Sequence, residues 1–462
     1  MRNSNKNITS TNYRFNKKIS RKRNLRLWWQ KYQWQFIGIF AFLTLILGYI
    51  GFMDYFNSIG EYRSPLSYLY LSLQLFILES GAISEQLNWE LQLARFLAPA
   101  IGAYAALQAL SLIFQEQLEI VRLRFLRSHI VICGLCRRGR LFTERFLEQG
   151  YPVVVIELDE NNNMIKHCRD YGAIVLIGNA TDKKILLKAG VDKAEYLISV
   201  CGNDGTNAEV AVNAREISSK NEDKILTCFA HIFNPQLCHL LREREIETGQ
   251  TNFFRLEFFN IFDIGARSLL IDYPPFSEDD KFEKSQPHLL IVGVGRMGES
   301  LVFHAATKWE KIYSKFNKKL RITVIDKIAK CKKELLYLQY PKLERICELI
   351  SLQIDVNSPD FHCAEFLFDE NNKCDITKIY ICLDNDSLAL STALTLNQLI
   401  RNQNIPIVVR MIRDTGLATL LRVEEKNKSH FKNIYAFGLL ERTCQPNLIL
   451  RETKELPTEI MI

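Results

Sequence analysis

The chain has 462 residues, of which 47% are hydrophobic and 24% charged, and this composition excludes a protein that is disordered throughout. The length suffices for two or three domains. The net charge of +7 is unevenly placed, because residues 1–31 contain ten Lys or Arg and no acid, and the remainder has 49 basic against 52 acidic residues. No basic surface is spread over the fold, so we expect no nucleic-acid partner.

The twelve cysteines all lie at or after residue 133. This usage is typical of a reduced cytosolic portion and argues against a disulfide scaffold. The chain begins without a short apolar segment followed by a small-residue cleavage site, so we expect no signal peptide. We interpret residues 1–31 as a basic cytoplasmic tail.

Residues 32–115 are predicted to form a membrane domain. Residues 32–53 are uncharged, and a helix of this length reaches about 30 Å, the thickness of a bilayer core. A second uncharged run, 96–114, is rich in Ala and Gly, as helix-packing faces in membranes often are. We predict spans at about 32–53 and 95–115. The alternative is two buried helices of a soluble protein, which the length of the first run and its lopsided charged flanks disfavour.

The loop charges predict the orientation of these spans. Ten bases precede the first span and three arginines follow the second, whereas the connecting segment 54–90 contains five acids and a single arginine. The positive-inside rule then places both termini in the cytoplasm, in a multi-pass protein of the cell membrane.

The connector contains a third uncharged run, residues 64–78, whose helix would be about 22 Å long and too short to span. It is either a re-entrant helix or an amphipathic helix lying on the outer leaflet. As a re-entrant helix it would end at Glu79, Ser80 and Gly81, and in a symmetric oligomer a ring of Glu79 carboxylates would favour cations. As a surface helix it would leave Glu79 solvated among the headgroups.

Short apolar runs alternate with helical patterns after residue 128. They lie at residues 129–133, 153–156, 173–176 and 196–200, and a second series lies at 289–292, 322–325, 349–354, 379–382 and 405–409. Strands that alternate with helices indicate βαβ units and a parallel sheet. We therefore predict two doubly wound α/β domains of Rossmann type, 129–272 and 287–450, with a connection that contains paired prolines.

Each copy opens with a strand, a glycine turn and a helix, which is the context of a dinucleotide-binding fingerprint. In the second copy the motif is Gly293-Val-Gly295-Arg-Met-Gly298, and the next strand ends in Asp326. Its glycines allow a tight turn, close approach to a pyrophosphate and close helix packing, and the acid is placed to bind ribose hydroxyls. We predict that these four residues bind NAD or another adenine nucleotide.

The first copy departs from this pattern at one position. It reads Gly134-Leu-Cys136-Arg-Arg-Gly139, and Glu157 ends its next strand. Cys136 replaces the middle glycine, so phosphate binding would be weaker there or shifted toward the two arginines. Gly134, Gly139 and Glu157 are its predicted nucleotide-binding residues, and the alternative for both copies is a fold that holds no nucleotide.

Other patterns indicate little chemistry. The pair Cys133 and Cys136 has C-x-x-C spacing, but Cys133 belongs to an apolar strand, where cysteines are usually inert. The eight histidines show no metal-ligand spacing, so we predict no metal site. Polar residues that follow the fourth strand of each copy, at 202–204 and 384–386, either face a ligand or cap the next helix.

The cytoplasmic part resembles a known family. The stretch 129–216 is similar to the regulator-of-potassium-conductance (RCK, TrkA N-terminal-like) domain. The similarity lies in Gly178-Asn-Ala-Thr181 after the third strand and in residues 189–194 before the fourth. Residues 287–421 resemble a more divergent copy. Two spans around a short third segment, followed by RCK modules, resemble the layout of RCK-gated potassium channels. The resemblance implies a homo-oligomer, with a tetramer favoured. Residues 64–90 contain no T-V-G-Y-G filter, so potassium selectivity is not implied.

Our leading hypothesis is a channel or channel-like transporter of a monovalent cation, in a lipid membrane, gated by nucleotide binding to the tandem cytoplasmic domains. The alternative is a membrane-tethered regulatory subunit that binds nucleotide and conducts nothing. A membrane-anchored NAD-dependent oxidoreductase is a third hypothesis. The sequence contains no obvious substrate domain and no evident catalytic acid, base or metal set, so we predict that the protein is not an enzyme.

Overall fold

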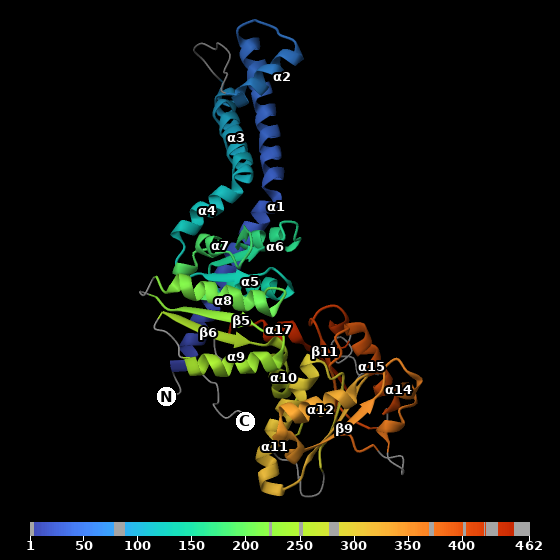
Figure 1. Cartoon of the computed structure of the whole chain (residues 1–462). Coiled ribbons are helices and arrows are strands. Elements are labelled where there is room, and N and C mark those ends of the chain that lie inside the picture. Colours follow the sequence, from blue (N-terminus) through green and yellow to red (C-terminus); the bar gives the residue numbers. More distant parts are fainter. Residues whose placement is uncertain are drawn as a thin grey trace. The chain divides into compact units, whose positions relative to one another are not determined.

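The computed structural model describes residues 4–77, 88–220, 224–248, 253–276, 286–368, 374–400, 403–419, 421 and 433–447 (Figure 1). They fall into two compact units. The first comprises residues up to Leu126 with Glu148–Gly150, and the second comprises Arg127–Leu147 and the chain from Tyr151 onward.

The first unit is helical. Ser64 caps its short middle helix by accepting the N–H of Ser67 (3.4 Å), and Pro65 stands in the first turn, where a helix tolerates proline. Its elements are α1 (Ser4–Ser58), α2 (Pro65–Gln74), the 3-10 turn η1 (Leu75–Ile77), α3 (Trp89–Ile113) and α4 (Gln115–Phe125).

Two helices of this unit, Tyr32–Ser58 and Trp89–Leu110, are long and apolar enough to cross a membrane. They approach closely at Gly51, where a Cβ would lie 2.8 Å from the backbone nitrogen of Leu91, so a larger residue would force the helices apart. Much of their outer surface is apolar and uncovered: Phe40, Phe42 and Phe96 are 58%, 63% and 72% exposed. Such faces are what a lipid-facing helix presents.

The second unit contains two six-stranded parallel sheets. The first sheet has the order β3-β2-β1-β4-β5-β6, so the strand order reverses between β1 and β4. Its strands are β1 (Ile130–Cys133), β2 (Val153–Glu157), β3 (Ile174–Ile177), β4 (Tyr196–Ser199), β5 (Leu226–His231) and β6 (Phe254–Phe259). The associated helices are α5 (Arg137–Glu148), α6 (Met164–Tyr171), α7 (Lys183–Lys188), η2 (Val191–Lys193), α8 (Asp204–Ser218), α9 (Pro235–Thr248) and α10 (Ile261–Asp272).

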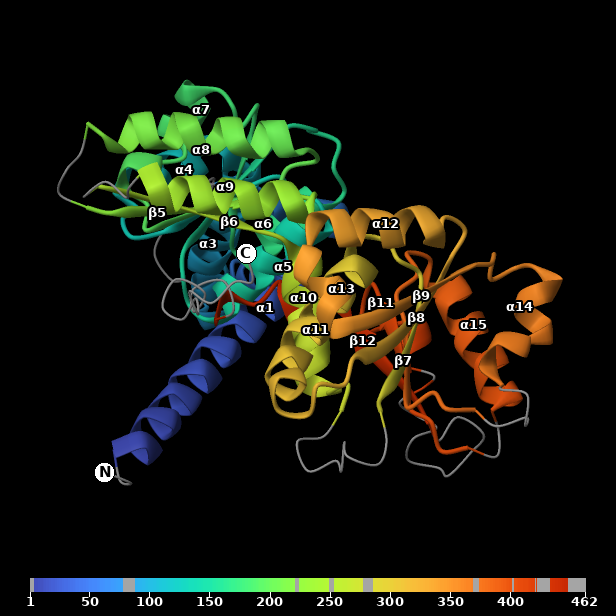
Figure 2. The same ribbon diagram turned by 60° about the horizontal axis from the view of Figure 1, so that its bottom comes forward.

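The second sheet repeats this order as β9-β8-β7-β10-β11-β12, with helices on both faces (Figure 2). Its strands are β7 (His288–Val292), β8 (Leu320–Asp326), β9 (Cys347–Gln353), β10 (Lys378–Ile381), β11 (Ile407–Met411) and β12 (Ile434–Gly438). The helical elements are α11 (Arg296–Phe316), α12 (Ala329–Gln339), α13 (Pro341–Ile346), α14 (Pro359–Cys363), η3 (Glu365–Leu367), α15 (Asp386–Leu399) and α17 (Leu439–Thr443). The predicted fold class is confirmed.

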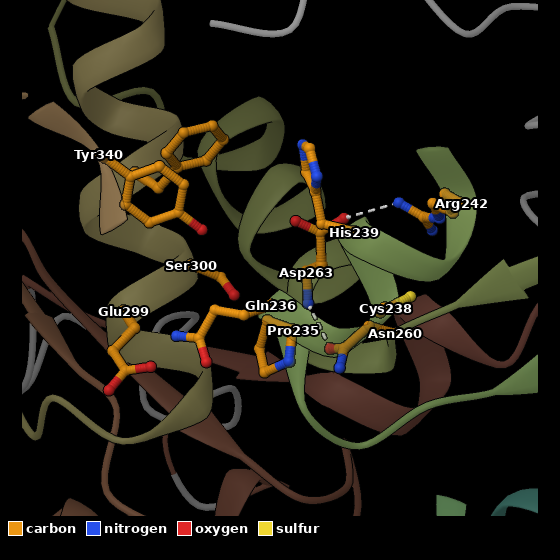
Figure 3. A pocket seen from close by; sticks show the side chains of 11 residues that line it. Pro235, Gln236, Cys238, His239, Arg242, Asn260, Asp263, Glu299, Ser300 and Tyr340 are labelled. Atoms are coloured by element: carbon orange, nitrogen blue, oxygen red, sulfur yellow. Dashed lines mark hydrogen bonds and ion pairs between the residues drawn. The ribbon is translucent and has the colours of Figure 1, made fainter. Parts of the chain in front are cut away.

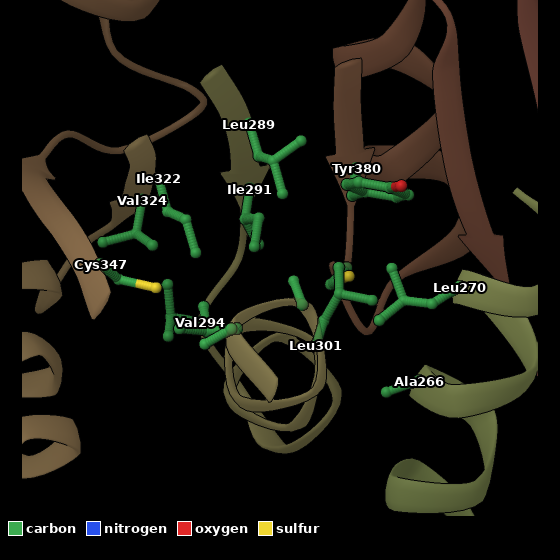
Figure 4. Packing of buried hydrophobic residues seen from close by; sticks show 14 of the residues in the cluster. Ala266, Leu270, Leu289, Ile291, Val294, Leu301, Ile322, Val324, Cys347 and Tyr380 are labelled. Carbon is green, nitrogen blue, oxygen red and sulfur yellow. The ribbon is translucent and has the colours of Figure 1, made fainter. Parts of the chain in front are cut away.

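Two helices join the copies by contributing side chains to both cores. Ile261 and Ile264 of α10 pack in the first core, whereas Ala266 and Leu270 of the same helix pack in the second. Figure 4 shows the second contact, with Ala266 and Leu270 lying beside Leu301 of α11. In α17, Leu439 and Leu440 likewise belong to different cores, so a change at this helix acts on both copies.

Candidate nucleotide site

The glycine turns of the two copies have the same backbone geometry. Gly134 and Gly293 have φ of +94° and +89°, a region that glycine enters without strain. Both lie close to the backbone just after the fourth strand of their copy. A Cβ on Gly134 would be 3.1 Å from Cys201, and one on Gly293 would be 3.1 Å from Cys382. A side chain at either position would therefore distort the turn.

The last glycine of each motif allows the helix to pack on the turn. A Cβ on Gly139 would lie 1.9 Å from the carbonyl oxygen of Gly134, and one on Gly298 would lie 2.1 Å from that of Gly293. Neither approach is possible for a side chain. Both helices thus begin directly against their turns, with N-termini at the carboxyl edge of the sheet, where the helix dipole favours an anion.

The strand-end acids hold these turns. Glu157 accepts the N–H of Leu135 at Oε2 (2.6 Å), and Asp326 accepts the N–H of Val294 at Oδ2 (2.9 Å). Both carboxylates are only partly buried, and each oxygen has a second lone pair for a ribose hydroxyl. One carboxylate can therefore fix the turn and still face a ligand.

A cavity of about 360 Å³ lies at the point where the first sheet reverses its strand order. Its lining includes Gly134, Glu157 and Gly178, which follow or end the first three strands, together with Asn203 and Thr206 after the fourth. Ligands of open α/β sheets bind at this position. The cavity, glycine turn and carboxylate together fit an adenine nucleotide.

Cys136 is accommodated in this cavity by a contact with strand β4. Its Sγ donates to the carbonyl oxygen of Val200 (3.3 Å), so the thiol is held toward the end of the strand. The departure from the usual glycine therefore leaves a cavity in place.

A larger side chain follows the fourth strand in the second copy. The side chain of Leu383 would lie 3.0 Å from a Cβ on Gly293, where the first copy has the smaller Cys201. By contrast, no atom lies within 4 Å of a Cβ on Gly295, which leaves open space for the approach of a phosphate. Beside this turn, Arg410 is 95% buried and donates to the carbonyl oxygen of Leu383 (2.8 Å). The motif of the second copy is intact, and Leu383 stands beside its first glycine.

The polar residues after the fourth strands cap helices. Asn203 accepts the N–H of Thr206 (2.8 Å), and Asn385 accepts the N–H of Leu388 (3.0 Å). The adjacent Asp204 accepts the N–H of Phe233 (2.6 Å) and ties this edge to the next strand. In the first copy both interpretations left open by the sequence hold, because Asn203 caps the helix and also lines the cavity.

The thiols at this edge are poor nucleophiles. Burial raises the pKa of Cys133 well above its usual value and that of Cys201 to about 11. Because the thiolate is the reactive form, the C-x-x-C spacing has no redox consequence that the structure supports. The described residues contain no group of three His, Cys, Asp or Glu side chains that is placed to hold a metal ion.

His231 occupies an unusual position at the end of β5. It is fully buried, and neither ring nitrogen has a hydrogen-bond partner among the described residues. Phe233 lies edge-on to it, with ring centres 4.5 Å apart, and the guanidinium of Arg138 lies 4.3 Å from the centre of the Phe233 ring. Burial, helped by the nearby charges of Arg138 and Arg296, lowers the pKa of His231 to about 3, so its ring is neutral at physiological pH.

A polar pocket between the copies is lined by α9, α10 and α11 (Figure 3). Asp263 is its charged centre: it accepts from His304 (2.6 Å) and Arg267 (3.2 Å), and Arg242 lies 3.8 Å away. Burial alone would raise the pKa of Asp263, but these three partners hold it well below its usual range. This network links the copies, because Asp263 of α10 contacts Arg242 of α9 and His304 of α11.

The structure places the predicted nucleotide-binding residues in two separate regions. Gly134, Gly139 and Glu157 lie together at the first turn. Gly293, Gly295, Gly298 and Asp326 lie together at the second. Glu79, Ser80 and Gly81 lie outside the described residues.

Sequence reasoning missed Asn162, whose Nδ2 donates to the carbonyl oxygen of Leu135 (3.1 Å) and which lines the first cavity. Its run of three asparagines just after the second strand was the available signal.

Comparison with known proteins matches residues 130–248 to the TrkA-N domain. These residues are a TrkA-N domain. Potassium channel protein 1 of Methanocaldococcus jannaschii is 34% identical over 97 residues, which are 21% of this chain and 29% of that protein. The Trk system potassium uptake protein TrkA homolog of Pyrococcus abyssi is 28% identical over 93 residues, 20% of this chain and 40% of that protein. The TrkA-N match lies in the first α/β copy, and the family predicted from the sequence is confirmed.

The chain spans well under half the length of these curated relatives. A solved structure described as the GsuK channel bound to NAD is 14% identical to this chain, with a TM-score of 0.46, and the match covers 93% of this chain and 84% of that one.

Proposed function

We propose that this protein is a membrane-embedded potassium-transport protein regulated by an adenine nucleotide. The cavity at the strand reversal of the first copy carries the proposal, because it combines a glycine turn, a helix N-terminus and Glu157 in a TrkA-N domain. The names of the related proteins supply the ion, since they describe potassium channels and potassium uptake proteins.

The helical unit supports a membrane location. Tyr32–Ser58 and Trp89–Leu110 have the length and apolar surface of spans, and the shorter helix between them supports the proposed re-entrant segment. Both termini lie in the cytoplasm in this proposal, with the protein in the cell membrane as a homo-oligomer, a tetramer being favoured. Glu79 would then stand near the axis and favour cations over anions.

We favour a channel in which nucleotide occupancy alters the pore. A ligand shifts such an equilibrium only if it binds the two states differently, so the cytoplasmic copies must rearrange on binding. The second candidate is a regulatory subunit that binds nucleotide and conducts nothing, and one relative is by name a Trk system potassium uptake protein.

The nucleotide would be bound mainly through Glu157, which would accept from a ribose hydroxyl and repel a 2′-phosphate. NAD(H) should therefore bind better than NADP(H), and ADP should bind through the same group. We propose the same role for Asp326 in the second copy.

Calorimetric titration of the purified full-length protein tests this assignment. Glu157→Gln should weaken binding of ADP and NAD roughly tenfold, the loss of about one charge-assisted hydrogen bond. Glu160→Gln is the matched control, because Glu160 lies three residues away, is exposed and does not line the cavity. Equal affinities in wild type and Glu157→Gln would refute the assignment of the first cavity. Asp326→Asn tests the second copy in the same way.

A further inference from the structure

A second cavity, of about 470 Å³, adjoins the proposed nucleotide cavity. Asp159 and Asn162 line both cavities, so the two spaces are contiguous. Asn162 is fixed at this boundary by its bond to the carbonyl oxygen of Leu135 in the glycine turn. Asn162 therefore stands between the glycine turn and the second space.

Three arginines and one carboxylate line the second cavity. Arg137 and Arg140 stand on the first two turns of α5, and Arg413 comes from the second copy. Arg137 is exposed and has no ion pair with a described residue. The carboxylate is Asp159, whose Oδ1 accepts the N–H of Asn161 (3.0 Å). The residues that line the cavity thus have a net positive charge, which suits an anion.

Two of the arginines are held in position by glutamates outside the lining. Arg140 Nε lies 3.2 Å from Glu144, and Arg413 Nε lies 3.5 Å from Glu441. Each pair uses one side of a guanidinium that has five N–H donors, so donors remain for a phosphate. Arg140 and Arg413 are therefore oriented by their ion pairs, whereas Arg137 is exposed.

The segment that carries Arg413 is anchored on the first copy. Leu440, which also lines the cavity, packs in the first core with Cys444, and its N–H is donated to the carbonyl oxygen of Ile412 (3.2 Å). Arg413 follows strand β11 of the second sheet directly. Any force on its guanidinium is therefore transmitted to the second copy.

We propose that this cavity is a phosphate subsite, formed by Arg137, Arg140 and Arg413, that takes the outer phosphate of a nucleotide held in the first cavity. The proposal rests on the proposed function and extends it: the second copy contributes a residue to the ligand of the first, and the length of the phosphate chain decides whether Arg413 is engaged. A nucleoside monophosphate fills the first cavity alone, and a di- or triphosphate bridges both copies.

Calorimetry of full-length protein in detergent with AMP, ADP and ATP tests the proposal. In the wild type, affinity should rise roughly tenfold from AMP to ATP, the effect expected of one charge-assisted contact. Arg413→Gln should remove most of this increase and leave the affinity for AMP unchanged, whereas Arg413→Lys should keep part of it. Arg442→Gln is the matched control, because Arg442 lies on nearby α17, pairs with Asp272 and does not line the cavity.

Titration with inorganic phosphate distinguishes the two sources of the phosphate group. Weaker phosphate binding in Arg413→Gln, with an unchanged ratio of ATP to AMP affinity, would support a subsite for a separate phosphate. If Arg413→Gln changes neither the ratio of ATP to AMP affinity nor the binding of inorganic phosphate, the proposal is overturned, even if nucleotides bind normally. A wild-type protein that binds no nucleotide would refute the proposed function. The phosphate titration would still show whether the second cavity binds phosphate.

Discussion

The substitution Gly139→Ala tests the geometry of the first glycine turn. The new Cβ would lie 1.9 Å from the carbonyl oxygen of Gly134, and helix and turn must separate by about 1.1 Å to reach 3.0 Å, below which such contacts essentially do not occur. Both groups belong to backbone, so no side chain can rotate away. Overpacking of this kind costs about 3 kcal/mol, which lowers Tm by roughly 6–12 °C in a cooperative unit of 150–250 residues.

A thiol-reactive dye measures this loss in the full-length protein. Every cysteine lies at or after residue 133, so dye incorporation on heating reports unfolding of the α/β unit through buried thiols such as Cys168 and Cys228. Gly205→Ala is the matched control, because Gly205 lies in the first turn of α8 and its nearest neighbour would be 3.5 Å from the new Cβ. It should melt at or slightly above the wild-type temperature. A Gly139→Ala protein that melts within 2 °C of wild type, a threshold of roughly 1 kcal/mol or less, would refute the packing argument.

Three further predictions concern pH and topology. The pKa of His231 is about 3 in the folded protein and about 6.5 in the unfolded chain, so the free energy of unfolding should fall as pH drops from 6.5 toward 3. The loss from this residue is about 2 kcal/mol at pH 5. Urea titrations at pH 7 and pH 5 should show that His231→Phe removes this loss. Asp263→Asn should lower the free energy of unfolding by about 3 kcal/mol at pH 7, because it leaves the partners of the carboxylate without a negative charge. Since folding lowers the pKa of this carboxylate, the difference in unfolding free energy between variant and wild type should become smaller below about pH 4. An equal gap at pH 7 and pH 3 would contradict this assignment. An impermeant thiol reagent outside the cell should label a cysteine at Ser58 and spare one at Ser10; the reverse labelling would show the opposite orientation.

The sequence predicts the interior strands well because they are buried on both faces. Runs such as residues 130–133 and 289–292 are continuously apolar, and all their residues are buried in the structure. Strands β5, β6 and β12 were missed. In β6 the exposed Arg255 and the partly exposed Glu257 alternate with buried residues, as expected at the edge of a sheet, and this interrupts the apolar run.

The candidate site also contains residues that the sequence predicts and residues that it does not. Glycines and strand-end acids are local signals, so Gly134, Gly139 and Glu157 were identifiable from spacing. The approach of Arg413 to helix α5 depends on the packing of Leu440 in the other copy's core, and no local pattern contains that information. The approach of Leu383 to the turn at Gly293 likewise joins residues that are far apart in the sequence.

Potassium flux in proteoliposomes tests the central claim most directly. Purified wild-type protein should support a potassium flux that changes when ADP or NAD is added on the side of the α/β unit. Glu157→Gln should support the same basal flux with a response that needs roughly tenfold more nucleotide, and Glu160→Gln should respond like wild type. Absence of flux under every nucleotide condition would contradict the channel, and a flux that ignores nucleotide in wild type would contradict regulation through the first cavity.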